Sequence, residues 1–277
     1  MLIKYLLPLC TFISVTLFGD LKEEFNIKGY WYEGMSWKHF LKIRNALQRD
    51  ALVPYVDKIQ QQRLAKEVGL EVPKTFIATH EMTPIAELLK NLPSYVAKMT
   101  HLSYSEGLII VKDGINIITG EPITPEEVEQ RIFASLSSTP RQVESWALHQ
   151  VEPGFLVQEY IPNRMEVKIQ TIWGKAVIGE WRGGESYTAT TRIWGRYDRA
   201  GNKVDGKWEA PEWWPKAIEA AERMAKDTDA LRVDFLVKEN NELLLNELEI
   251  WPESNWTSMI PAIETALNDG YRALWSK

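Results

Sequence analysis

The fold is decided by the stretch LRVDFLVKENNELLLNELEI, residues 231–250. Two apolar runs flank Asn240 and Asn241, and Asn tolerates the positive φ angle that a two-residue turn requires. We therefore predict a β-hairpin around these two residues. Since successive side chains of a strand point to opposite faces, Arg232 and Asp234 share one face of the first strand. The other face of that strand is apolar, with Leu231, Val233, Phe235 and Val237.

This hairpin gathers three carboxylates. A two-residue turn pairs Asp234 with Glu247, with α-carbons about 4.5–5.5 Å apart, and Glu249 follows about 6.6 Å further along the same face. The second strand is predicted to place Leu244, Leu248 and Ile250 on one face and Leu243, Leu245, Glu247 and Glu249 on the other. Carboxylates so close repel one another unless a cation lies among them. A Mg²⁺ ion bound by these carboxylates and by substrate phosphates would remove the repulsion. Alternatively, the carboxylates form a solvated strand face that Arg232 neutralises. The spacing leaves both interpretations open.

The remaining chain alternates predicted helices and strands. One helix is expected to begin after Asp57, a suitable N-cap, and to end at Gly69, and another to follow Thr124 with Pro125 in its first turn. Further apolar patterns predict helices over 36–53, 84–91 and 212–227, and strands over 74–78, 94–99, 107–112, 154–161, 166–172 and 175–182. A Gly-, Thr- and Arg-rich loop is expected over 183–207. The neighbouring strand pairs indicate antiparallel sheets, and thus an α+β fold with two or more lobes.

Composition narrows the class of protein. The chain has 277 residues, a net charge of −6 and 45% apolar residues, which excludes wholesale disorder, collagen-like repeats, a polytopic membrane protein and a broad nucleic-acid-binding surface. Cys10 is the single cysteine, so disulfide frameworks, zinc clusters and thiol nucleophiles are excluded, and any metal is expected to have oxygen ligands. The 12 tryptophans fit either aromatic platforms for sugars or bases, or ordinary core packing.

The N-terminus carries an uncharged apolar run, residues 5–18. It is short for a membrane span and about right for a signal-peptide core. A leader or anchor and a buried first helix or strand are both compatible with this pattern.

Several ordered segments resemble the ATP-grasp superfamily. They are VDKIQQQRLAKEVGLEVPKT (56–75), YVAK (95–98), FLVQEYIP (155–162), MEVKIQTIWGK (165–175) and the helix with its hairpin over 221–252. The likeness covers about residues 53–256 and is greatest to the TupA-like branch, which is involved in teichuronopeptide synthesis. It implies two α+β lobes clasping ATP between antiparallel sheets. The expected divisions are an apolar leader or anchor at 1–19, a helical segment at 20–74, a first lobe at 75–160 and a second lobe with the metal site at 161–277.

The resemblance also implies roles for individual residues. Lys58, Lys98 and Lys168 would contact nucleotide phosphates, Glu166 would accept the ribose hydroxyls, and Arg182 would approach the transferred phosphoryl group. The expected catalytic residues are Lys98, Lys168 and Arg182. The expected adenine hinge is formed by Gln158, Glu159, Tyr160 and Ile161, with the backbone of Glu159 and Ile161 binding the base. The expected ligands of Mg²⁺, for which Mn²⁺ could substitute, are Asp234, Glu247 and Glu249.

Each of these roles has a simpler alternative. Lys58 and Lys98 could be surface lysines, and Glu166 and Lys168 a cross-strand salt bridge. The loop after Lys98 reads MTHLSYSEG, with Gly107 as its single glycine, whereas the family uses a glycine-rich loop there. His101 and Ser103 would partly substitute for the missing glycines. Glu249 stands where many relatives have Asn.

The function implied is an ATP- and Mg²⁺-dependent carboxylate–amine ligase. An acceptor carboxylate would attack the γ-phosphate, and an amine would then displace phosphate from the acyl phosphate. A phosphotransferase acting on a sugar or other hydroxyl acceptor, and a non-catalytic glycan-binding module, are the alternatives. The expected partners are ATP, a small or polymeric carboxylate and an amine, without nucleic acid. Use of ATP favours a cytoplasmic location. The apolar run at residues 5–18 leaves membrane association and export open.

Overall fold

The computed structural model describes residues 36–141, 145–162, 165–183, 186–191, 195–197, 203–204, 210–250 and 267–270. Only the backbone is described for Lys38, Ser145 and those of these residues that fall within 181–204. The apolar run at 5–18, with Cys10, lies outside these ranges. Within the described residues, no helix combines the length and the apolar character that a membrane crossing requires.

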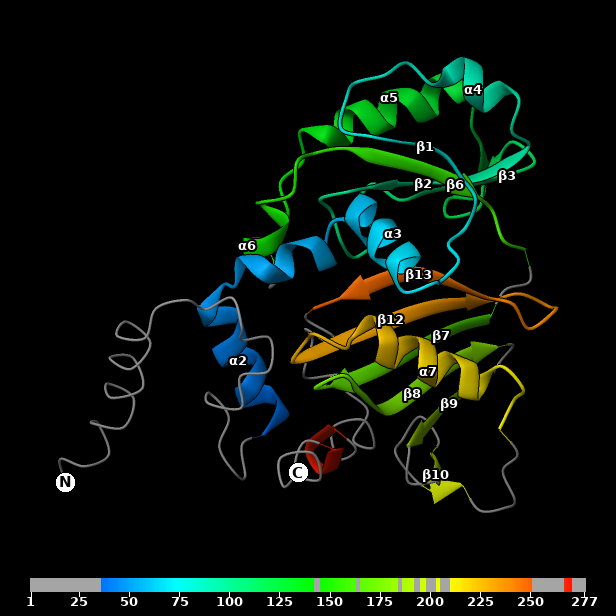
Figure 1. Cartoon of the computed structure of the whole chain (residues 1–277). Coiled ribbons are helices and arrows are strands. Elements are labelled where there is room, and N and C mark those ends of the chain that lie inside the picture. Colours follow the sequence, from blue (N-terminus) through cyan, green and yellow to red (C-terminus); the bar gives the residue numbers. More distant parts are fainter. Residues whose placement is uncertain are drawn as a thin grey trace.

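The first sheet has six strands and forms the upper lobe in Figure 1. Its order is β1 (Thr75–Thr79), β6 (Phe155–Glu159), β2 (Ser94–Met99), β3 (Ile109–Lys112), β4 (Ile115–Asn116) and β5 (Glu121–Pro122), with every neighbouring pair antiparallel. Two helices, α4 (Ala86–Lys90) and α5 (Pro125–Leu136), cover its outer face. The predicted cap of α5 is confirmed, because Thr124 and Glu127 form a reciprocal capping box. The core beneath these helices includes Ile85, Leu89, Tyr95, Val128, Ile132 and Phe155.

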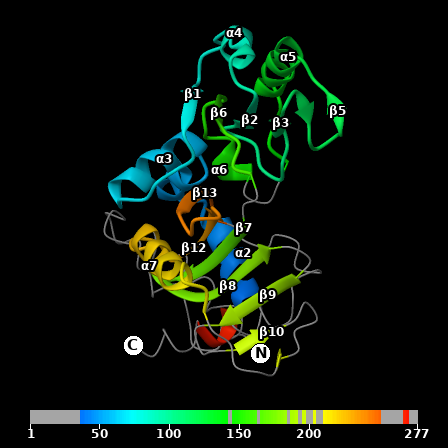
Figure 2. The ribbon, with the colours of Figure 1, turned by 90° about the vertical axis from the view of Figure 1, so that its right-hand side faces the viewer.

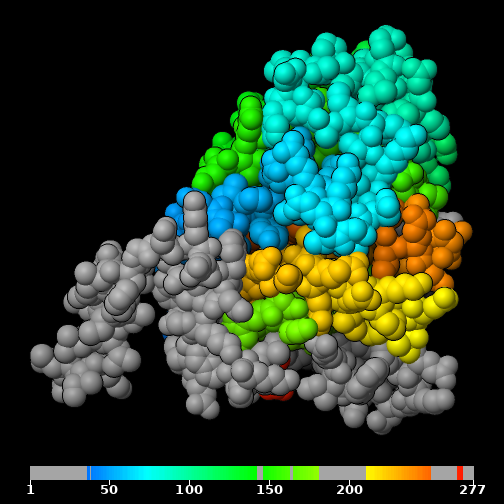
Figure 3. Space-filling model, in the orientation of Figure 1, coloured from blue at the N-terminus to red at the C-terminus, as the bar shows by residue number. Residues whose placement is uncertain are grey.

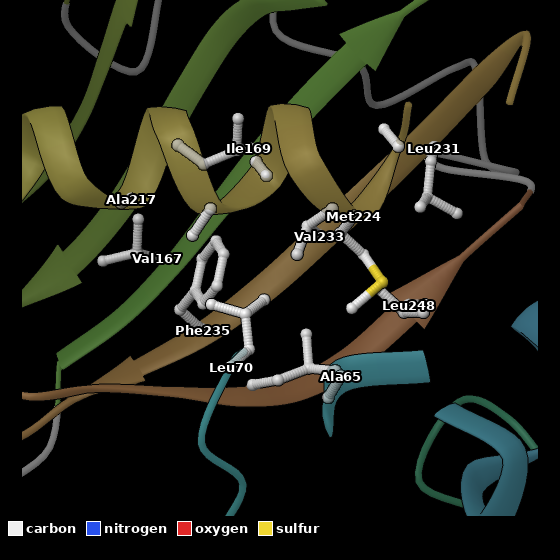
Figure 4. Close-up of a cluster of buried hydrophobic side chains, with 14 of the residues drawn as sticks. Ala65, Leu70, Val167, Ile169, Ala217, Met224, Leu231, Val233, Phe235 and Leu248 are labelled. Carbon is white, nitrogen blue, oxygen red and sulfur yellow. The ribbon is translucent and has the colours of Figure 1, made fainter. Parts of the chain in front are cut away.

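The second sheet has seven strands and forms the lower lobe. Its order is β11 (Lys203–Val204), β10 (Gly195–Tyr197), β9 (Ser186–Thr191), β8 (Lys175–Gly183), β7 (Met165–Ile172), β12 (Ala230–Val237) and β13 (Leu243–Glu249), again antiparallel throughout. Helix α7 (Trp214–Met224) covers one face. Figure 4 shows the core beneath it, with Val167, Ile169, Val233 and Phe235 from the strands and Ala217 and Met224 from the helix. The opposite face carries Glu166, Lys168, Arg232 and Asp234.

The helices of the N-terminal part are α2 (Trp37–Leu47), the 3₁₀ helix η4 (Asp50–Tyr55) and α3 (Lys58–Glu67), and α6 (Ser145–Leu148) packs near η4. Helix α2 lies beside the second sheet (Figure 2), whereas α3 lies next to the hairpin and between the two lobes (Figures 2 and 3). The single helix predicted over 36–53 is wrong, because Gln48 takes a left-handed conformation with φ 45° and ends α2. The predicted boundaries of α3 are confirmed: Asp57 Oδ1 accepts a hydrogen bond from Ile59 N, and Gly69 has φ 70°.

The hairpin of β12 and β13 has the predicted pairing of Asp234 with Glu247 but a different turn. Lys238 N donates to Glu242 O, and Asn241 has φ 64°, so three residues, 239–241, form the loop instead of two. A β-bulge compensates for the additional loop residue. The ladder pairs Phe235 with Leu245 and Asp234 with Glu247, which leaves Asn246 without a partner across it.

The bulge changes which side chains share a face. Leu243 and Leu245 pack against the core under α7, together with Leu248. Leu244 instead forms a small cluster with Leu236 and Ile161 on the other face. The predicted placement of Leu243, Leu244 and Leu245 is therefore wrong, since strict alternation does not allow for the additional residue.

The α+β class with antiparallel sheets is confirmed by this topology. The loop predicted over 183–207 is corrected in part, because β9, β10 and β11 lie within that range and extend the second sheet. The expected divisions at residues 19, 74 and 160 stay predictions.

Candidate functional site

A cavity of about 420 Å³ lies between the two sheets. Both lobes and α3 contribute to its walls, which explains why residues distant in the sequence meet there. Seven of the predicted site residues line it: Lys58, Lys98, Gln158, Glu159, Ile161, Glu166 and Glu247. Tyr160, Lys168, Asp234 and Glu249 are not among its lining residues.

Lys58 is the first residue of α3 and reaches across the cavity. Its Nζ donates to Leu102 O at 2.7 Å and lies 3.1 Å from a carboxylate oxygen of Glu247. Only 11% of its side chain is exposed, so the interpretation of Lys58 as a surface lysine does not hold. The ammonium connects the loop after β2 to a carboxylate of the second sheet.

Lys98 lies on β2 and faces the second sheet. Its Nζ donates to Asn246 Oδ1 at 2.7 Å, with Asn246 O at 3.5 Å. Two lysines, Lys58 of α3 and Lys98 of β2, thus line the cavity. They place positive charge where a polyanion such as a nucleotide phosphate chain could lie.

The end of β6 forms another wall. The Gln158 amide donates to Pro73 O at 3.4 Å and to Thr75 Oγ1 at 3.3 Å, while Glu159 Oε1 accepts a hydrogen bond from Lys74 N at 2.8 Å. The backbone N–H of Glu159 also donates to Lys74 O. An adenine role for the backbone of Glu159 would therefore have to use its carbonyl oxygen.

The polar face of the second sheet continues the site beyond the cavity. Glu166 and Lys168 lie on β7, and Lys168 Nζ is 3.6 Å from Asp234. Lys168 forms a cross-strand ion pair, as the simpler alternative predicts, and its partner is Asp234 on β12. Lys168 thus belongs with the hairpin carboxylates.

Arg232 lies among the three carboxylates. Its Nε and Nη2 donate to the two oxygens of Asp234, both at 2.7 Å, and Nη2 also pairs with Glu249. Arg232 is buried, with 4% of its surface exposed. Sequence reasoning considered this arginine as the neutralising partner, and the structure places it in that position.

The pKa values of Glu247 and Glu249 shift in opposite directions. Burial acts most strongly on Glu247 and opposes its ionisation, but the charges of Lys58, Lys98 and Arg232 outweigh burial and lower its pKa. Burial, with repulsion from Asp234 and Glu247, raises the pKa of Glu249 to about 8 despite the nearby Arg232. The two carboxylates therefore differ in how easily they lose a proton, and burial is the largest single influence on each.

The predicted metal ligands do not form a metal-binding group as they stand. Among the described residues, no set of three or more His, Cys, Asp or Glu side chains is arranged to hold a metal ion. Asp234 and Glu249 are paired with Arg232, and Glu247 with Lys58. Their oxygen donors suit Mg²⁺. The metal site stays a prediction.

The loop after β2 lines the cavity through residues 103–106. It has few glycines, yet Tyr104, Ser105 and Gly107 all have positive φ, at 53°, 63° and 68°. Left-handed backbone is costly for residues other than glycine and clusters at functional sites. His101, expected to support phosphate binding, is buried and is not among the lining residues; its Nε2 lies 3.2 Å from Ser138 O.

Part of the predicted site lies outside the described residues. Arg182 lies on β8, where its backbone pairs with Glu166 of β7, but the side chain of Arg182 is not described. From the sequence, Arg192 and Arg196 are weaker candidates for the same role as Arg182, and Trp181 and Trp194 are candidates for lining an acceptor pocket. The side chains of Trp181 and Arg196, and Arg192 and Trp194 as a whole, also lie outside the described residues. Of the described tryptophans, Trp37, Trp213 and Trp214 are buried and Trp146 packs against the large core, which agrees with ordinary core packing.

Asn246 and Leu236 line the cavity but were not predicted as site residues from the sequence. The signal for Asn246 is the break in alternation in the segment LLLNE, residues 243–247. Two adjacent polar residues after three leucines fit a bulge better than a regular strand.

Comparisons with known proteins give only distant likenesses. No family model and no curated protein matches the chain. Among solved structures, the ATP complex of D-alanine–D-alanine ligase from Bacillus anthracis is 18% identical, with a TM-score of 0.48, over 80% of this chain and 64% of that one. The biotin carboxylase complex with β,γ-ATP from Campylobacter jejuni is 16% identical, with a TM-score of 0.49, over 80% and 48%.

A third likeness is to N5-carboxyaminoimidazole synthetase from Staphylococcus aureus complexed with ADP. It is 13% identical, with a TM-score of 0.46, over 73% of this chain and 46% of that one. The chain thus spans 46–64% of the length of these three solved chains.

Proposed function

We propose that the chain is an ATP-grasp enzyme, an ATP- and Mg²⁺-dependent carboxylate–amine ligase. The observation that carries the proposal is the cavity between two antiparallel sheets, in which Lys58 pairs with Glu247 and Lys98 donates to the adjacent Asn246. The ordered sequence motifs support it, since they place the same residues at the phosphates and the metal. Membership of the TupA-like branch, and with it a role in cell-surface polymer synthesis, is the finer form of this proposal.

The residues suit phosphate chemistry by positioning and charge. Lys58 and Lys98 would bind the phosphate chain, and Glu166 at the cavity wall would accept the ribose hydroxyls. Apolar side chains of Val96, Ile110, Ile161 and Leu236 line the cavity and would enclose the base. Such a site needs neither a thiol nor a serine nucleophile.

The hairpin carboxylates would hold Mg²⁺, with Asp234, Glu247 and Glu249 as ligands. When bound, Mg²⁺ neutralises charge on the phosphates and orients them. For Glu247 to serve as a ligand, the Lys58 ammonium, now 3.1 Å away, would turn toward the phosphates. Arg232 would remain beside Asp234 and limit repulsion within the cluster.

The proposed reaction is the one that the resemblance to the ATP-grasp superfamily implies. An acceptor carboxylate oxygen attacks the γ-phosphorus, the bond to the β-phosphate oxygen breaks, and ADP leaves. An amine nitrogen then attacks the acyl carbon of the acyl phosphate, the bond to phosphate breaks, and the amine loses a proton. Lysine charge at the phosphates stabilises the negative charge that develops in the first step.

The test measures phosphate release with ATP, Mg²⁺ and a panel of carboxylate and amine acceptors. Glu247→Gln removes one charge without changing shape, and we expect turnover to fall at least about 100-fold. Glu242→Gln, on the exposed end of the same hairpin, is the matched control and should retain activity. Equal Mg²⁺-dependent turnover in wild type and Glu247→Gln would refute the site, and a phosphorylated product without an amide would select the phosphotransferase alternative.

A further inference from the structure

We propose that Asn246 is a positioning residue for Lys98. Its neutral side chain holds the lysine ammonium at the cavity from the opposite sheet, and it leaves the charge of the lysine available for the nucleotide phosphates. The inference rests on the proposed function, because it takes Lys98 as a phosphate-binding residue.

The contact joins the two lobes directly. Lys98 comes from β2 of the first sheet and Asn246 from β13 of the second, and both line the cavity. The distance from Nζ to Oδ1 is 2.7 Å, within the range of a strong hydrogen bond to a charged donor. The side-chain carbonyl of Asn246 therefore fixes the end of a long, flexible side chain.

The β-bulge is what brings Asn246 to this place. In a regular strand Asn246 and Glu247 would point to opposite faces. Since Asn246 is the additional residue of the bulge, both of these side chains line the cavity instead. Bulges re-aim side chains in this way next to functional sites.

The bulge is held from its outer edge by α3 and the residues that follow it. Leu245 N donates to Glu71 O at 2.8 Å. Beyond the bulge, the Gln61 amide bonds both Leu248 O at 3.1 Å and Leu248 N at 3.2 Å. These bonds lie on the side of β13 that faces away from β12, so the irregular strand has defined partners on both sides of the bulge.

A neutral amide is suited to this task in a way that a carboxylate is not. An amide oxygen orients the ammonium while the net charge of the pair stays at +1. A carboxylate at the same position would reduce that charge to zero and would repel an approaching phosphate. With Glu247 already adjacent, a further negative charge would also increase the repulsion within the acidic cluster.

The experiment measures binding of adenylyl imidodiphosphate with Mg²⁺ by calorimetry. We expect Asn246→Ala to weaken binding by roughly tenfold, the effect of losing one hydrogen bond to a charged group. Asn246→Asp, which keeps the shape, should weaken it further, and more so at low salt. Asn240→Ala, in the exposed turn of the same hairpin, is the control and should bind as wild type.

Two further measurements separate positioning from a structural role. In a Lys98→Met background, Asn246→Ala should cause no additional loss, because its effect acts through the lysine. Adenosine, which lacks phosphates, should bind wild type and Asn246→Ala equally. Multiplicative losses in the double variant, or an equal loss for adenosine, would overturn the inference.

The two proposals can fail separately. Wild type that does not bind the analogue would overturn the proposed function and this inference with it. Wild type that binds, together with an Asn246→Asp variant of unchanged affinity and normal circular dichroism, would overturn the inference alone. Because Asn246→Asp retains the size of the side chain, it keeps the test decisive even where Asn246→Ala does not fold.

Discussion

Replacing Arg44 tests how the N-terminal part of the chain is fastened to the second sheet. Arg44 is 3% exposed and projects from α2. Its Nε donates to Asp229 Oδ1 at 3.0 Å, Nη2 donates to Ala230 O at 2.7 Å, and Nη1 donates to Ile250 O. One side chain thus joins α2 to the start of β12 and the end of β13.

Arg44→Met keeps the aliphatic volume but leaves Asp229 as a buried carboxylate without its counter-charge. Removing one partner of a buried ion pair costs about 3–5 kcal/mol, and the two strand-end carbonyls lose a donor as well. For domains of 150–250 residues each kcal/mol lowers Tm by about 2–4 °C. We therefore expect Tm to fall by roughly 6–20 °C.

The assay is thermal and urea unfolding followed by circular dichroism. Arg44→Met with Asp229→Asn should recover part of the loss, because the second change removes the uncompensated charge. Lys42→Met, at an exposed position of the same helix, is the matched control and should lie within about 0.5 kcal/mol of wild type. An Arg44→Met protein as stable as this control would refute the assignment of Arg44 as the fastening residue.

Two other predictions concern the loop after β2 and the packing under α7. Burial lowers the pKa of His101, and the nearby charge of Lys58 adds to this effect, although a hydrogen bond to Ser138 O opposes it. Neutral His101 is therefore favoured in the folded state. The contribution of His101 to the free energy of unfolding should be fully present above the unfolded pKa of about 6.5 and should be lost as the pH falls below that value. Urea unfolding at pH 7.5 and 5.0 should show that His101→Gln loses less stability on acidification than wild type, and an identical loss would contradict this account. A Cβ at Gly179 would overlap the Trp214 ring, so Gly179→Ala should cost about 1–3 kcal/mol. Adding Trp214→Phe should restore part of that loss, and thermal unfolding that shows no difference between wild type and Gly179→Ala would exclude the overlap.

The hairpin shows how far sequence reasoning reaches. Alternation correctly assigned both faces of β12, because each of its residues follows the regular pleat. The pairing of Asp234 with Glu247 was also correct, but for an incomplete reason. The turn has one residue more than predicted, and the bulge at Asn246 restores the register. The additional turn residue and the bulge compensate for each other in the pairing of Asp234 with Glu247. Between the turn and the bulge the register differs by one residue from the prediction, so Leu243, Leu244 and Leu245 lie on the faces opposite to those predicted.

Lys58 and Lys98 could be singled out from the sequence because the segments around them resemble the ATP-grasp superfamily, and both line the cavity. Their roles at the phosphates stay predictions. The contacts of these lysines with Glu247 and Asn246 could not be identified, because they join elements about 150 residues or more apart. The ion pair of Lys168 with Asp234 likewise depends on the pairing of β7 with β12, two strands separated in the sequence by β8 to β11 and α7.

The attachment of α2 and α3 to the final hairpin has a consequence for how the chain folds during synthesis. Gln61 bonds Leu248 across 187 positions, and Arg44 bonds Ile250 across 206. At a translation rate of about 5–20 residues per second, roughly 10–40 s pass before the hairpin follows these helices out of the ribosome. During that interval the apolar residues of α2 and α3 lack their final partners. We expect the N-terminal helices to be the part of the chain that depends most on chaperones during synthesis.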